Sequence, residues 1–212
     1  AACIGAQFDL PILATISQPS AADTAQALLP ALKQYTVQAL NSNYRFVSED
    51  SEPLDLQLNY QFQHDRVQQA AYGLIDVKRL PQVHLSIGRL MLAHIDGEVP
   101  DERLSDIVGH FNQAIGLIKS PDERLCLAEL NLRSGKRAKK ATAYKAALDY
   151  LLVAEQLLPA NAWVSAPAIM KVLASEIQQC YYLTGKTEQA DKWIEILLVR
   201  AESNLQRSDI LA

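Results

Sequence analysis

The sequence predicts a mainly α-helical chain that carries a small β-sheet near its N-terminus. Two observations predict this fold class. From Leu54 to Phe62 apolar residues alternate with polar ones, the pattern of a strand with one buried face. From about Pro81 onward strand patterns are absent, and apolar residues recur with the spacing of amphipathic helices. We therefore expect strands only before about residue 64.

The N-terminal part is predicted to combine two short helices with a hairpin. Asp9, followed by Pro11, predicts the start of a short helix that ends near residue 16. Ser20, with Asp23 three positions later, predicts the start of a second helix that ends near residue 34. The segments YTVQAL and YRFV, joined by NSN, predict a hairpin, and the acidic loop SEDSEP leads into the alternating strand. Helix, helix, hairpin, strand and helix in this order resemble a winged helix over residues 1–80, truncated at its N-terminus.

The strand is expected to run directly into a helix at His64 and Asp65. The apolar positions that follow have helical spacing; they are Val67, Ala70, Ala71 and Leu74. Asp65 fits the N-cap of this helix, and Gln68 would complete a box-like cap. His64 shares the parity of the apolar strand residues, so we expect its side chain to point inward, beside a helix N-terminus where anions are favoured.

The remainder, residues 81–212, is predicted to be a string of antiparallel helices. The helical patterns cover residues 81–94, 100–118, 121–134, 136–158, 166–184 and 187–205, and Gly135 is one of the predicted breaks. Two groups of residues have tetratricopeptide-repeat (TPR) spacing; they are Ala147, Leu151, Ala154 and Pro159, and Tyr181, Gly185, Ala190, Ile194 and Leu197. A stack of TPR-like helix pairs and an irregular helical bundle are equally compatible with this spacing.

Composition is that of an ordinary soluble protein, with 49% hydrophobic and 21% charged residues. No apolar run is long enough to span a bilayer, and the opening residues lack the pattern of a signal peptide. We expect a cytoplasmic location, no membrane partner and, because the initiator Met is absent, a piece of a longer protein. Three cysteines lie far apart among apolar residues and are expected to be buried thiols.

A DNA-binding winged-helix regulator is the alternative function. Residues 1–63 contain two basic and six acidic residues, a net charge of −4, whereas residues 64–212 contain eighteen of each. The segment 21–34, which would enter the DNA groove, has one cation, Lys33, and no arginine. Because DNA affinity rests on neutralising phosphates, nucleic acid is not expected as a partner.

A basic run, RSGKRAKKATAYK, occupies residues 133–145 and contains no acidic residue. One interpretation is a solvated helix start, although basic residues there oppose the helix macrodipole. The other is a patch that docks an acidic surface, such as the acidic segment of a neighbouring domain. The residues of this patch are Arg133, Lys136, Arg137, Lys139 and Lys140.

No catalytic or metal-binding residue is predicted. The sequence has no phosphate-binding loop, no kinase H-R-D or D-F-G motif, and no arrangement of Ser, Cys, His and Asp typical of nucleophilic catalysis. His84, His94 and His110 lack the spacing of metal ligands. We therefore expect no enzymatic activity and no cofactor in this chain.

Three segments resemble a known family. They are AACIGAQFDLPILATIS, YQFQHDRVQQAAYGLI and HFNQAIGLIKSPDERLCLAELNLRSGKRAKKATAYKAALDYLLVAEQLL. They are similar to the region that follows the ATPase core in signal-transduction ATPases with numerous domains (STAND). The most similar type carries a serine/threonine kinase at its N-terminus and sensor and histidine-kinase modules at its C-terminus, and is common in cyanobacteria. The resemblance covers nearly the whole chain, but after Trp163 only the repeat rhythm remains.

The resemblance implies a regulatory module whose histidine senses nucleotide. In that family a winged-helix domain packs on the ATPase core, and its His-Asp pair corresponds to the Met-His-Asp motif of apoptosome and plant-resistance ATPases. His64 would contact the β-phosphate of ADP and Asp65 would hold the local backbone, while Gln63 replaces the Met. A histidine that is simply satisfied at a strand end is the alternative.

The resemblance also implies where nucleotide and partners bind. ADP or ATP with magnesium would bind in the parent protein, a serine/threonine or histidine kinase, rather than in this chain. The implied partners are the adjacent ATPase core, other domains of the same polypeptide, and proteins that bind the helical repeats.

Overall fold

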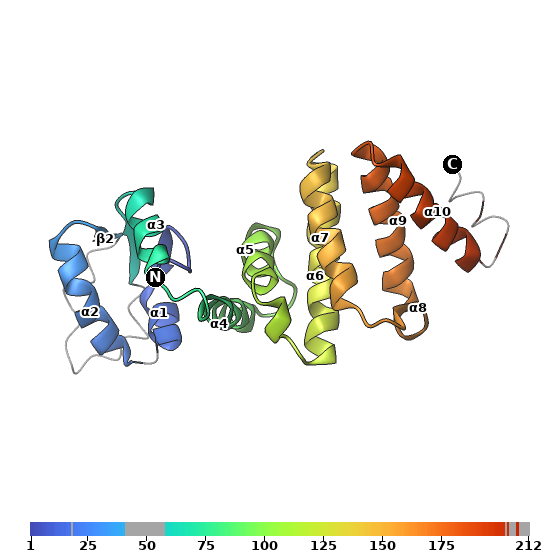
Figure 1. Cartoon of the computed structure of the whole chain (residues 1–212). Coiled ribbons are helices and arrows are strands. Elements are labelled where there is room, and N and C mark those ends of the chain that lie inside the picture. Colours follow the sequence, from blue (N-terminus) through green and yellow to red (C-terminus); the bar gives the residue numbers. More distant parts are fainter. Residues whose placement is uncertain (18, 41–57, 202, 204–206, 208–212) are drawn as a thin grey trace. The chain divides into compact units, whose positions relative to one another are not determined.

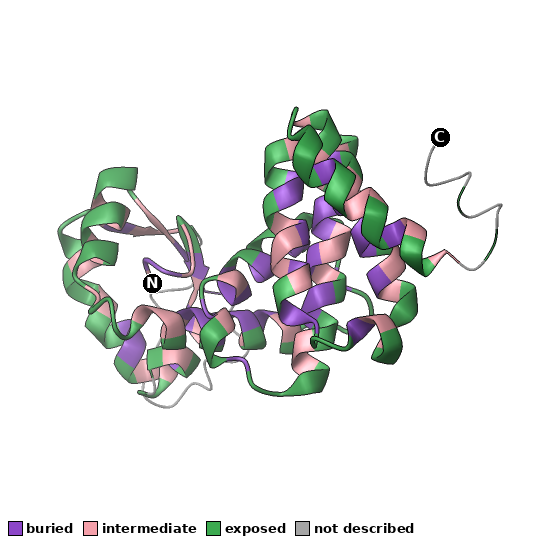
Figure 2. Ribbon diagram, turned by 45° about the vertical axis from the view of Figure 1, so that its right-hand side comes forward, coloured by how far each residue is buried: buried purple, intermediate pink, exposed green. Residues whose placement is uncertain are grey.

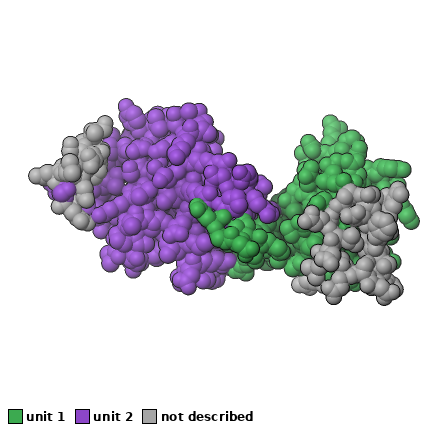
Figure 3. Space-filling view, turned by 180° about the vertical axis from the view of Figure 1, so that it is seen from behind, with its two compact units in different colours: residues 1–98 green, residues 99–212 purple. Residues whose placement is uncertain are grey.

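The computed structural model describes residues 1–17, 19–40, 58–201, 203 and 207, and it is mainly α-helical with a small antiparallel sheet, as predicted (Figure 1). The chain forms two compact units, residues 1–98 and residues 99–212 (Figure 3). In the described ranges every strand lies before residue 64, which confirms the expected change from strand to helix.

The first unit contains three strands and four helices in the part that the structure describes. In chain order they are β1 (Gln7–Asp9), α1 (Leu10–Ser17), α2 (Ala21–Lys33), β2 (Val37–Ala39), β3 (Asn59–Phe62), α3 (Asp65–Gly73) and α4 (Leu80–Ala93). The strand β3 lies in the centre of the sheet, antiparallel to β1 and β2. The second strand of the predicted hairpin, the SEDSEP loop and residues 54–57 lie outside the described residues.

One face of the sheet builds the core of the first unit. Leu58 and Tyr60 are buried, as the alternating pattern predicts, and Phe8 of β1 lies opposite Tyr60 with ring centroids 5.8 Å apart. Leu10 and Leu13 of α1 extend the same core. The strand β1 is not predicted by the sequence analysis, because its three residues are strand only through their pairing with β3.

The two N-terminal helices begin where the sequence predicts. The backbone N–H of Ile12 donates to Asp9 Oδ1 at 2.7 Å, which satisfies an unpaired amide in the first turn of α1. Ser20 caps α2, where its Oγ accepts the N–H of Asp23 at 3.0 Å.

The second unit is helical throughout its described residues. In chain order its elements are α5 (Asp101–Asn112), the short 3-10 helix η3 (Ile115–Leu117), α6 (Pro121–Lys140), α7 (Tyr144–Leu157), α8 (Ala162–Ser165), α9 (Pro167–Leu183) and α10 (Thr187–Arg200). The long helices pack in chain order, α5 on α6, α6 on α7, α7 on α9 and α9 on α10. Figure 2 shows the buried positions gathered along their facing sides. Each long helix thus contacts the next one along the chain, and α6 also contacts α9.

Gly135 does not break a helix, so that prediction is wrong. It lies inside α6, which continues to Lys140, and it is buried against α7. A Cβ added at Gly135 would lie 2.7 Å from the side chain of Leu151 and 3.2 Å from the carbonyl oxygen of Ala147. The glycine is therefore a contact residue that lets the backbones of α6 and α7 approach closely.

The turn after α6 and the turn after α9 have the same hydrogen bonds. After α6, the N–H of Thr142 donates to the carbonyl of Lys139, and the N–H of Ala143 donates to the carbonyl of Ala138. After α9, the N–H of Gly185 donates to the carbonyl of Tyr182, and the N–H of Lys186 donates to the carbonyl of Tyr181. Both turns centre on a residue with positive φ, 60° at Thr142 and 75° at Gly185. This is the Schellman arrangement, which ends a helix and reverses the chain.

Candidate functional site

The structure places His64 between the sheet and a helix, at the junction predicted from the sequence. His64 follows β3 and has extended backbone angles, φ −145° and ψ 144°. Its carbonyl oxygen accepts the N–H of Val67 at 2.9 Å, the bond that opens α3. The imidazole is exposed and makes no capping hydrogen bond.

Two details of the prediction for this junction are wrong. The N-cap is His64 rather than Asp65, which is the first residue of α3, and no side chain caps the helix. The His64 side chain is exposed rather than inward. The alternation does not carry over to His64 because pairing within the sheet ends at Phe62, although the backbone at His64 is still extended. The carboxylate of Asp65 makes no hydrogen bond or ion pair with the described residues.

The helix α3 is held to the first unit by polar contacts at each end. Gln68, expected to complete the cap, instead donates its Nε2 to the carbonyl of Ala2 at 3.2 Å. At the other end, Tyr72 Oη lies 3.2 Å from Nε2 of His84, which is buried on α4. No residue of α3 is fully buried, and Leu74 directly after it is 88% exposed. The sequence analysis considered His84 but did not predict this contact, which joins residues twelve positions apart.

The stability of the first unit should decrease as the pH falls below neutrality, and His84 should contribute to this. Burial lowers the pKa of His84, so the unfolded chain binds a proton at a higher pH than the folded one does. The stability present above the unfolded pKa is therefore lost as the pH falls through the folded pKa. His84→Gln should flatten the pH dependence of urea unfolding between pH 7 and pH 5 (roughly the range over which histidine titrates). Tyr72→Phe leaves the imidazole in place and should therefore retain the pH dependence of unfolding. An unchanged pH dependence in His84→Gln would contradict the prediction.

The basic run lies at the end of a helix, not at its start as predicted. Arg137, Lys139 and Lys140 occupy the last turn of α6, where the macrodipole favours cations. Several members of the predicted patch already have partners within the second unit. Arg133 donates to the carbonyl of Val99 at 2.7 Å and pairs with the carboxylate of Asp101, and Arg137 donates to the carbonyl of Asp101.

Lys139 has a structural role that separates it from the rest of the patch. Its Nζ forms an ion pair with Glu176 of α9 and donates to Gln179 Oε1 at 2.7 Å. The two charged side chains are only 20% and 15% exposed. Charge reversal at Lys139 would leave two acidic groups buried together, so it would disturb the α6–α9 contact rather than report on a partner.

A groove lies where Arg133 and its neighbours face the start of α5. It has a volume of about 400 Å³ and is lined by Asp101, Glu129, Leu132, Arg133, Lys136, Arg137 and Lys140. Lys136 and Lys140 are exposed and have no hydrogen bond or ion pair with the residues that the structure describes. The sequence analysis identified the cations of this groove but not Asp101, Glu129 and Leu132. These three residues lie outside the basic run: Asp101 begins α5, and Glu129 and Leu132 precede the run in α6.

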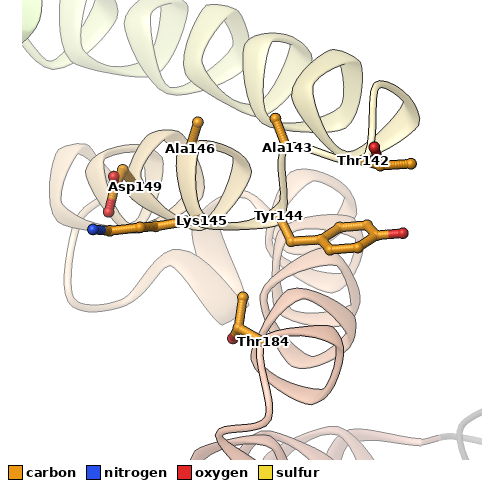
Figure 4. A pocket seen from close by; sticks show the side chains of 7 residues that line it. All are labelled: Thr142, Ala143, Tyr144, Lys145, Ala146, Asp149 and Thr184. Carbon is orange, nitrogen blue, oxygen red and sulfur yellow. The ribbon is translucent and has the colours of Figure 1, made fainter.

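A second cavity, of about 540 Å³, opens beside the turn between α6 and α7. Figure 4 shows its lining, which comes from that turn, from the first residues of α7 and from the end of α9. The lining residues are Thr142, Ala143, Tyr144, Lys145, Ala146, Asp149 and Thr184. The Thr184 hydroxyl already donates to the carbonyl of Cys180 at 2.8 Å, so it is satisfied within its own helix. Most of the exposed lining is apolar, and Lys145 and Asp149 are its charged residues.

Potential metal ligands do not cluster in the described residues: no group of three or more His, Cys, Asp and Glu side chains is close enough to hold an ion. All three cysteines are free; Cys3 and Cys180 are buried as expected, whereas Cys126 is exposed, contrary to expectation. Burial raises the pKa of the Cys180 thiol. None of the helices in the described ranges is long and apolar enough to cross a membrane.

Comparison with known proteins gives one distant similarity. No family model matches the chain, and no solved structure matches it. The chain is similar to hybrid signal transduction histidine kinase G of Dictyostelium discoideum, with 27% identity over 179 residues. The similarity covers 73% of this chain but spans only 5% of the length of that kinase. The chain is thus related in sequence to a small part of a large signal-transduction protein.

Proposed function

We propose that this chain is a non-catalytic regulatory and interaction module of a multidomain signal-transduction protein. The observation that carries the proposal is the similarity to a small part of a hybrid signal transduction histidine kinase. The architecture supports it, because a small mixed unit is followed by helices that pack serially, an arrangement that offers long surfaces for protein binding.

The finer form of the proposal is a coupling device. Residues 1–80 act as a winged-helix domain that docks on an adjacent ATPase core, and residues 81–212 act as a TPR-like arm that binds proteins or other domains of the same polypeptide. His64 supports this form, because an exposed imidazole at the uncapped start of α3 is accessible to a phosphate brought by another domain. ADP or ATP with magnesium binds in the core, not in this chain, and the parent is a serine/threonine or histidine kinase.

The chain alone should neither hydrolyse ATP nor gain stability from nucleotide. A ligand stabilises a protein only by binding its folded state, and the ligands for most of the nucleotide are proposed to lie in the core. Thermal unfolding of the chain should therefore be the same with and without ADP or ATP and magnesium. The same experiment on the longer protein is the control and should show a shift. Turnover of ATP by the chain alone, above that of a mock preparation, would overturn the proposal.

A further inference from the structure

We infer that the groove between the start of α5 and the last turns of α6 is a docking site for an acidic peptide. This inference deepens the interaction role proposed above by naming the chemistry of one partner. The groove is defined by the seven residues given above, and all of them belong to the second unit.

Charge is the first argument. Four cations and two acids line the groove, and Arg133 is already paired with Asp101. Lys136 and Lys140 remain exposed, and neither has an ion pair in the part of the chain that the structure describes. The excess of positive charge is local, because the whole chain carries a net charge of −4. A partner with carboxylates would form ion pairs with these two lysines, which have none within the described residues.

The groove is also held in shape before any partner binds. Arg133 and Arg137 of α6 both donate to groups at the start of α5, the first to Val99 O and the second to Asp101 O. Farther along, Asn112 of α5 and the fully buried Asn131 of α6 exchange hydrogen bonds of 2.9 and 3.1 Å. A site whose walls are already ordered loses less conformational entropy on binding.

The spacing of the two lysines sets the spacing of the carboxylates that would pair with them. Lys136 and Lys140 are four residues apart on α6, a rise of about 6 Å along the helix axis. Alternate side chains of an extended peptide are separated by about 6.6 Å and point to the same side. Carboxylates at every second residue of an extended peptide therefore match the two lysines, as do carboxylates four residues apart on a helical peptide, whereas adjacent carboxylates of an extended peptide would point to opposite sides.

Two other lining residues favour a peptide over a phosphate backbone. Glu129 and Asp101 place negative charge within the groove, which opposes a ligand with charge at every unit, such as a nucleic acid. Leu132 offers an apolar contact that a peptide side chain can use. The cations also lie at the C-terminal end of α6, where free carbonyls rather than free N–H groups face outward, so the backbone contributes no anion site.

Binding of a fluorescein-labelled peptide, with glutamate at every second position, one leucine and otherwise serine, tests the inference. Fluorescence anisotropy with the full chain at low salt should show saturable binding. The double variant Lys136→Glu, Lys140→Glu should weaken it about tenfold or more, because each exposed pair contributes up to roughly a factor of five and reversal adds repulsion. The matched control, Lys119→Glu with Lys192→Glu, makes the same change of net charge at two exposed lysines elsewhere in the unit and should retain near-normal affinity.

The other outcomes overturn the inference. An equal loss in both double variants would mean attraction by net charge alone. Equal binding of the peptide with glutamine in place of glutamate would remove the charge argument, and tighter binding of inorganic pyrophosphate or of a single-stranded oligonucleotide would identify a phosphate site instead. Circular dichroism establishes that each variant is folded. Because nucleotide and His64 are not involved, failure here leaves the nucleotide-coupling proposal untouched, and failure of that proposal leaves this groove untouched.

Discussion

Gly135→Val should destabilise the second unit by about 2 kcal/mol, as expected for overpacking of a closely fitted core. The first added carbon would lie 2.7 Å from the side chain of the fully buried Leu151, and 3.2 Å from the backbone oxygen of Ala147. Leu151 has little room to yield, and the Ala147 carbonyl belongs to the helix itself. Relief therefore requires α6 and α7 to separate. Urea unfolding followed by circular dichroism should show a lower midpoint.

A matched control separates this clash from ordinary helix propensity. Gly109 lies inside α5, is exposed, and would meet no atom within 4 Å if it gained a Cβ. Gly109→Ala should therefore stabilise the chain by about 0.5–1 kcal/mol, since glycine is a poor helix former. If Gly135→Val and Gly109→Ala changed the midpoint in the same direction, the close approach at Gly135 would not be what stabilises the α6–α7 pair.

His64→Ala in the full-length protein should weaken ADP binding by about 10- to 100-fold. The estimate follows from the loss of one charge-assisted hydrogen bond, roughly 1.5–3 kcal/mol. If the bond exists only in the ADP-bound, closed form, its loss shifts the equilibrium toward the open form, and basal signalling output should increase. Isothermal titration of ADP into parent and variant measures the first effect, and a phosphorylation assay without stimulus measures the second.

His94→Ala is the control for this experiment. His94 is another exposed histidine of the first unit, whose Nδ1 lies 2.7 Å from the carbonyl of Leu90 in its own helix. Its removal should leave ADP affinity unchanged. Equal ADP affinities for the parent and for His64→Ala would return His64 to the alternative of a histidine that serves only the end of a strand.

Local patterns predicted the elements whose signals are contained in a few neighbouring residues. Ser20 and Asp23 mark the start of α2 because the cap is a contact between residues three apart. The alternation around Tyr60 predicted the buried face of β3 for the same reason. The alternation did not predict the exposure of His64, because one face of the strand is buried only where the strand pairs within the sheet, and that pairing ends at Phe62.

Features that depend on distant parts of the chain could not be predicted in this way. The strand β1 exists because Gln7–Asp9 pairs with β3, more than fifty residues later. Gly135 has the composition of a helix break, and only the closeness of Leu151 on the next helix explains why a glycine stands there. The groove likewise lies between α6 and the start of α5. An interpretation based on the basic run alone therefore could not predict that Asp101 and Glu129 line it.

The matching turns at Thr142 and Gly185 show that one turn geometry can be built from different residues. The shift in sequence that brings Thr142 onto Gly185 also brings Ala147 onto Ala190 and Leu151 onto Ile194, and both alanines are buried. The two hairpins thus have the same turn geometry even though the residue at positive φ differs. Threonine is the costlier choice, since a side chain at positive φ is disfavoured by about 1 kcal/mol relative to glycine. The turn after α6 keeps the Schellman hydrogen bonds with a side chain at its positive-φ position, so this turn geometry does not require glycine.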